Sequence, residues 1–136
     1  MFVNKETIKN IKKLCRADKS IGLFYLFGSQ ATGEVGPLSD YDFAVYFDEF
    51  EKRLILEKKI GLIVELSNIM KTDNLDLVIL NEEAPPELKY SIIRDGQLIF
   101  EREPFRTLVE PKIMNEYFDF RTILLRHGLT QKVYVE

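Results

Sequence analysis

Apolar positions along the chain alternate between helical and strand-like spacing. Residues 4–18 carry an isoleucine or leucine at about every third position with lysines between them, which predicts a helix capped by Asn4. Residues 51–70 place their apolar side chains on one side of a 3.6-residue period, with lysines and glutamates opposite. This second stretch is the clearest helix in the sequence.

Short apolar runs between these helices predict strands. Residues 21–27, 41–47 and 75–80 are continuous runs rich in β-branched and aromatic side chains, as expected of buried strands. Residues 98–100 form a shorter run, which we expect to be an edge strand.

Proline and glycine mark the remaining boundaries. Two glycines and a proline within residues 29–39 leave room for only a brief helical turn there. A proline pair at 85–86 suits the start of a helix that runs to about residue 95 and stops at Gly96. A last helix is expected over residues 105–127, with a break near Pro111. The resulting order, αβαβαβαβα, predicts an α/β fold.

Length and composition are those of one ordinary globular domain spanning residues 1–136. The net charge of −3 provides no broad basic field, so a stable nucleic-acid partner is not expected. A lone cysteine, Cys15, excludes an internal disulfide and fits a reducing compartment. The first residues have no apolar signal core, and no run approaches the roughly 20 residues that span a bilayer. We therefore expect a cytoplasmic protein without a membrane segment.

Asp40 and Asp42 are the first candidates for chemistry. Side chains two apart on a strand share a face, so these carboxylates would lie side by side among apolar neighbours. Like charges at that spacing repel unless a cation lies between them, and Mg²⁺ prefers one or two carboxylates completed by substrate phosphates. An Asp-x-Asp pair alone is more often simply solvated.

Gly28 and Ser29, at the end of the preceding strand, make the metal interpretation stronger. A chain bend at this point leaves backbone N–H groups available to phosphate oxygens. Glycine suits the bend because a side chain would obstruct the approach of a phosphate. An anion cradle and a cation site would thus flank one short loop.

A third carboxylate fits the same site. If the helix over residues 51–70 connects two parallel strands, Asp76 starts the second of them beside Asp40 and Asp42. Asp73 is the alternative, but it precedes the strand and is more typical of a loop residue. Asp76 is favoured because an acidic residue inside an apolar strand needs a partner.

These residues together resemble the DNA polymerase beta nucleotidyltransferase superfamily, and the short chain is similar to its minimal nucleotidyltransferases, which act as antitoxins of HEPN-domain toxins. The resemblance covers about residues 21–100, followed by a helical segment at about 105–128. It implies a small mixed sheet with flanking helices, an α+β variant of the predicted class. The residue after the Gly-Ser pair is often arginine in that family, and here it is Gln30.

The same resemblance implies the role of each residue. Gly28 and Ser29 would bind the phosphates of ATP, Asp40 and Asp42 would hold two Mg²⁺ ions, and Asp76 would help to activate the attacking hydroxyl. The expected reaction moves AMP from ATP to a tyrosine of a HEPN-domain toxin. Two alternatives stay open: transfer to a small molecule such as an aminoglycoside, and an antitoxin that only covers its partner.

Overall fold

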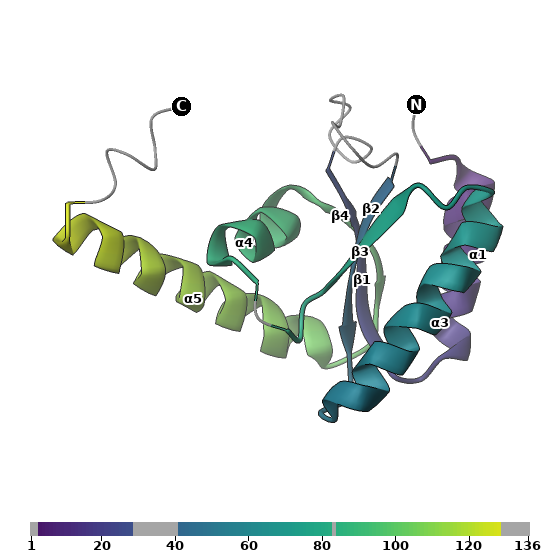
Figure 1. Ribbon diagram of the computed structural model, residues 1–136, viewed down its shortest axis with the longest axis horizontal. Helices are drawn as coiled ribbons and strands as arrows, with labels where there is room; N and C mark the ends of the chain where they lie inside the picture. The colour runs from purple at the N-terminus through teal and green to yellow at the C-terminus, as the bar shows by residue number, and fades with distance from the viewer. Residues whose placement is uncertain (1–2, 29–40, 83, 129–136) are drawn as a thin grey trace.

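A mixed four-stranded sheet forms the centre of the protein in the computed structural model, which describes residues 3–28, 41–82 and 84–128 (Figure 1). The strands are β1 (Ile21–Phe27), β2 (Tyr41–Phe47), β3 (Leu75–Ile79) and β4 (Gln97–Glu101), in the order β3-β2-β1-β4. β2 and β3 are parallel, whereas β1 is antiparallel to both β2 and β4. The predicted mixed sheet, with residues 98–100 in an edge strand, is confirmed.

Helices cover both faces of this sheet. They are α1 (Lys5–Ala17), α3 (Lys52–Met70), α4 (Pro86–Asp95) and α5 (Phe105–Arg126). α1 and α3 lie on one face and α4 and α5 on the other (Figure 1). The side chain of Asn4 accepts a hydrogen bond from the Thr7 amide at 2.8 Å, which confirms the predicted N-cap. The turn predicted over residues 29–39 lies outside the described residues.

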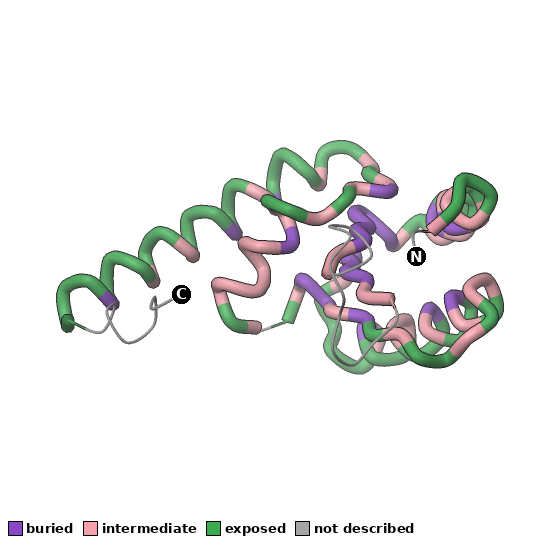
Figure 2. The backbone as a smooth tube through the Cα atoms, turned by 90° about the horizontal axis from the view of Figure 1, so that it is seen from above, coloured by how far each residue is buried: buried purple, intermediate pink, exposed green. Residues whose placement is uncertain are grey.

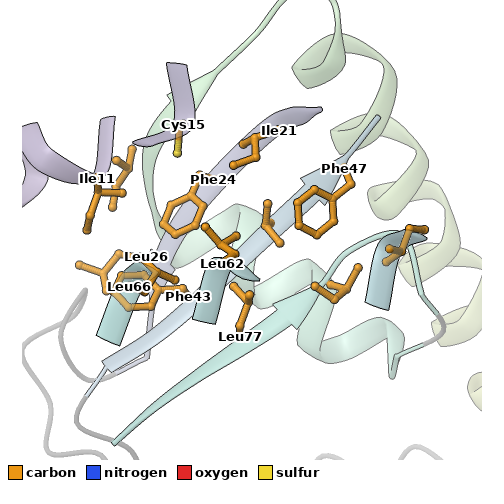
Figure 3. Packing of buried hydrophobic residues seen from close by; sticks show 14 residues of the cluster. Ile11, Cys15, Ile21, Phe24, Leu26, Phe43, Phe47, Leu62, Leu66 and Leu77 are labelled. Atoms are coloured by element: carbon orange, nitrogen blue, oxygen red, sulfur yellow. The ribbon is translucent and has the colours of Figure 1, made fainter. Parts of the chain in front are cut away.

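The face under α1 and α3 holds the larger apolar cluster. Alternate residues of the two central strands, among them Phe24, Phe43 and Phe47, have no exposed surface, and Leu66 of α3 packs with them (Figure 3). The rings of Phe24 and Phe43 lie 5.5 Å apart in a tilted arrangement. Burying one such side chain contributes about 1.5–3 kcal/mol, so this cluster is the main support of the strand positions.

The opposite face is buried under α4 and α5. Leu23, Ala44 and Ile113 pack there, and so does Tyr25, whose hydroxyl donates a hydrogen bond to Glu110 of α5. Because successive residues of a strand face opposite sides, the even-numbered residues of β2 and β3 belong to this face. This parity sets the side of the sheet on which Asp42 and Asp76 lie.

The predicted break near Pro111 is wrong, because α5 is continuous from Phe105 to Arg126. Proline supplies no N–H to the helix, so one backbone hydrogen bond is missing at this point. The turn is held by packing, since Val109 and Ile113 on either side of the proline are both buried against the sheet. Tertiary contact thus outweighs local propensity here.

α5 extends well past the sheet, and most of its outer half is exposed (Figures 1 and 2). Tyr90 of α4 stacks on Tyr117 of α5, with ring centroids 4.1 Å apart, and ties the two helices together. In the described part of the chain, no helix has the length and apolar character needed to cross a membrane.

Candidate active site

Asp42 and Asp76 lie directly opposite each other on neighbouring strands. They are Cα partners in the parallel pairing of β2 with β3, where strands run about 4.8 Å apart. In-register residues of adjacent strands point to the same face, so both side chains belong to the face under α4 and α5. The predicted adjacency of Asp76 and Asp42 is confirmed.

Gly28 closes the other side of Asp42. Phe27, the last residue of β1, is the Cα partner of Asp42, and Gly28 follows with a φ of +77°. A Cβ atom built on Gly28 would lie 2.5 Å from Oδ2 of Asp42. Only a residue without a side chain allows both this left-handed backbone and this close approach. The carboxyl group of Asp42 therefore packs against Gly28 on one side, and Asp42 is paired with Asp76 on the other.

The exposure of the two carboxylates differs. Asp42, on the second strand of the sheet, is partly buried, whereas Asp76, on the edge strand β3, is exposed. Two unit charges at the strand spacing repel by about 1 kcal/mol in water-like surroundings, and by more where water is excluded. A divalent cation bound between them would turn this repulsion into attraction, which fits the oxygen-only ligands of Mg²⁺.

The remaining predicted site residues are placed as follows. Ser29, Gln30 and Asp40 lie outside the described residues. Asp73 is exposed in the turn before β3 and has no partner on β2 in the strand pairing. Among the residues that the structure describes, no group of three or more His, Cys, Asp or Glu side chains is placed to hold a metal. The described part of a metal site is thus the Asp42–Asp76 pair.

A groove of about 830 Å³ lies at the opposite end of the sheet, where β2 and β3 finish. This groove could not be predicted from the sequence, because its walls come from segments far apart in the chain. One signal was present: Phe50 stands alone in an acidic run, and 90% of its side chain is exposed. Leu108, which is 60% exposed, lines the same groove, and exposed apolar side chains that gather in one place mark binding surfaces.

Comparison with known proteins identifies relatives of this arrangement. A family model described as "Polymerase beta, Nucleotidyltransferase" matches residues 9–105. A curated relative, the protein adenylyltransferase MntA of Aphanizomenon flos-aquae, is 33% identical over 86 residues, which cover 58% of this chain and 56% of the relative. The chain thus aligns with little more than half the length of that relative.

Solved structures resemble the whole arrangement of strands and helices. A crystal structure of a toxin–antitoxin with AMP-PNP contains a chain that matches with a TM-score of 0.70 and 23% identity over 93% of this chain and 97% of that one. A tri-AMPylated HEPN toxin of Shewanella oneidensis in complex with an MNT antitoxin gives a TM-score of 0.68 and 21% identity, over 95% and 97%. At these identities the likeness concerns the fold.

Proposed function

Because the chain belongs to the polymerase beta nucleotidyltransferase family, we propose that it transfers AMP from ATP to a tyrosine hydroxyl of a HEPN-domain toxin and so acts as an antitoxin. The similarity to MntA and to chains of AMPylated toxin–antitoxin complexes supports this activity and this partner. The whole chain would act as one nucleotidyltransferase domain in the cytoplasm, where ATP is plentiful.

The observation that carries the proposal is the position of Asp42 between Gly28 and Asp76. Its carboxyl group lies against Gly28 on one side and in register with Asp76 on the other. A carboxylate pair beside a glycine bend is the donor set that a metal-bound triphosphate requires. An aspartate pair with a purely structural role would not need a glycine with positive φ against one of its oxygens.

Each candidate residue has a distinct role in the proposed reaction. The backbone at Gly28 and Ser29 binds the phosphates of ATP. Asp40, Asp42 and Asp76 hold Mg²⁺, which neutralises charge on the phosphates when it is bound. Asp76, the most exposed of the described pair, faces the acceptor and can take the proton of the attacking hydroxyl. In-line attack at the α-phosphate then releases pyrophosphate.

A protein acceptor suits this molecule better than a small one. Asp76 is exposed on the edge strand β3, so a hydroxyl carried on the surface of a second protein can reach it. The net charge of −3 disfavours a nucleic acid. A tyrosine on a protein partner remains, and the HEPN toxin in the complex of the structural relative is itself AMPylated.

Intact-mass spectrometry tests the proposal. The protein, a HEPN-domain toxin from the same genome, ATP and Mg²⁺ should yield a toxin heavier by one or more AMP units, and Asp42→Asn should abolish the gain. ATP and Mg²⁺ together should also raise the melting temperature more than either alone, because each completes the binding site of the other. An unmodified but inhibited toxin would indicate an antitoxin that acts by binding alone. Transfer only to small hydroxylated compounds would indicate a small-molecule enzyme.

A further inference from the structure

The groove at the far end of the sheet has the anatomy of a helix-binding site. One wall is the first half of α5, where Leu108, Lys112 and Glu116 follow one another at intervals of four residues. These positions lie on one side of the helix and extend for about 12 Å. The opposite wall is the start of α3 and the loop before it, which contribute Ile55 and Phe50.

Hydrogen bonds fix the positions of the strand ends and of the loop that line this groove. The Asn81 side chain accepts from the Phe47 amide at 2.8 Å and donates to the Phe47 carbonyl at 2.6 Å, so that the end of β3 is bonded to the end of β2. The amide of Asp48 donates to the Ser20 carbonyl at 2.6 Å. The loop that carries Phe50 is therefore anchored at its base, and a ligand would enter a largely preformed site.

Charges of both signs surround the apolar walls and do not pair with one another. Lysines from three helices and glutamates from two loops and α5 line the groove. Within the described residues, no salt bridge joins any two of these six side chains. They are Lys52, Lys89, Lys112, Glu49, Glu82 and Glu116. Exposed apolar side chains, here Leu108 and Phe50, surrounded by charged ones are typical of protein interfaces.

We propose that this groove docks one amphipathic helix of the partner protein, with apolar residues at three- and four-residue spacing and charges that complement the rim. The partner helix would place an acidic side chain opposite Lys112 and a basic one opposite Glu116. A helix is the occupant we infer, because the groove follows α5 for about 12 Å, roughly two turns of a partner helix, and its exposed apolar side chains, Leu108 and Phe50, lie among charges of both signs. This inference rests on the proposed function for the identity of the partner.

The mixed charges argue against the other classes of occupant. A nucleic-acid backbone would meet three glutamates in the same groove, and the chain as a whole is acidic. The charged rim instead requires a partner surface that carries both positive and negative charges, which a helix with alternating charges provides.

The location of the groove leaves the catalytic end free. Tyr46, which lines the groove, and Asp42 lie on the same face of β2, four residues and about 13 Å apart. Between these two residues the face is covered by α4 and α5, so a partner docked at Tyr46 would bring an acceptor tyrosine to Asp42 and Asp76 past the exposed edge strand β3. Docking at one end and chemistry at the other would hold the acceptor near the reactive end at high effective concentration.

Binding measurements with matched variants test this docking site. Leu108→Glu places a charge on the apolar wall, and Leu125→Glu is the control, since the two leucines are 60% and 58% exposed on the same helix and only Leu108 lines the groove. The ligand is a HEPN-domain toxin from the same genome, and its binding is measured by calorimetry without ATP. Leu108→Glu should weaken the complex by about tenfold or more, and Leu125→Glu should leave it unchanged. Lys112→Glu, which reverses the charge of an exposed side chain in the groove, should weaken the complex as well.

Two further measurements separate docking from stability and from catalysis. Melting temperature and ATP affinity of Leu108→Glu should equal those of the control. A photo-crosslinker at Leu108 should capture a partner segment with apolar residues at three- and four-residue spacing. Equal binding by Leu108→Glu and Leu125→Glu, capture of a partner loop, or loss of self-association in place of partner binding would each overturn the docking site. Tight binding that Leu108→Glu disrupts, without any AMP transfer, would keep the docking site and refute the proposed function.

Discussion

Gly28→Ala should damage catalysis far more than stability. The new Cβ would lie 2.5 Å from Oδ2 of Asp42, whereas ordinary contacts begin at 3.4 Å. The carboxylate must therefore move by about 0.9 Å, the difference between these two distances. Misplacement of a reacting or metal-holding group by about 1 Å can cost on the order of 100-fold in rate.

The same substitution also strains the backbone. Gly28 has a φ of +77°, and a residue with a side chain in the left-handed region costs about 1–2 kcal/mol. Urea unfolding should show a loss of stability of this size, which leaves the protein folded. AMP transfer to the toxin should be measured at saturating ATP by intact mass.

Gly61→Ala is the matched control, because nothing lies within 4 Å of its added Cβ. Gly61 is inside α3, where alanine is favoured over glycine by up to about 1 kcal/mol, so this variant should be slightly more stable and fully active. If Gly28→Ala transferred AMP as fast as Gly61→Ala, the close packing of Gly28 on Asp42 would have no role in catalysis. The contact of Gly28 with Asp42 would then be structural only.

Three other changes test the site and the core. Asp42→Asn without Mg²⁺ should keep or slightly raise the melting temperature, because it removes one of two like charges on adjacent strands; a clear fall would contradict the repulsion. Asp76→Asn should slow transfer by about 100-fold or more with little change in ATP affinity, while Asp73→Asn stays active; the reverse pattern would show that Asp73 is the third carboxylate. Burial, and secondarily the charge of Asp18, raises the pKa of Cys15 from 9.0 to about 12. The folded state thus holds the thiol proton more tightly than the unfolded state does. The free energy of unfolding should therefore keep its full value below pH 9.0 and fall by about 1.4 kcal/mol per pH unit above it. Urea unfolding at pH values on either side of 9.0 should show this slope, and Cys15→Ala should flatten it.

Local pattern alone was enough to predict most of the secondary structure. β1 and β2 begin and end at the predicted residues, and α4 ends before Gly96 as its breaker predicts. These elements could be read from the chain because each one is defined by the spacing of its own apolar residues and by the conformational limits of glycine and proline. The candidate metal residue Asp76 could be chosen over Asp73 for a similar reason, since only Asp76 lies inside an apolar strand.

Tertiary structure decided what depends on contacts between distant segments. The continuity of α5 through Pro111 follows from burial of Val109 and Ile113 against the sheet, which no local rule includes. The approach of Gly28 to Asp42 depends on the register of β1 with β2. The groove beside Leu108 exists only where three helices and the ends of two strands meet. A sequence records the propensity of each segment, but register, burial and concavity arise from pairs of segments, and their energies outweigh local preferences where the two disagree.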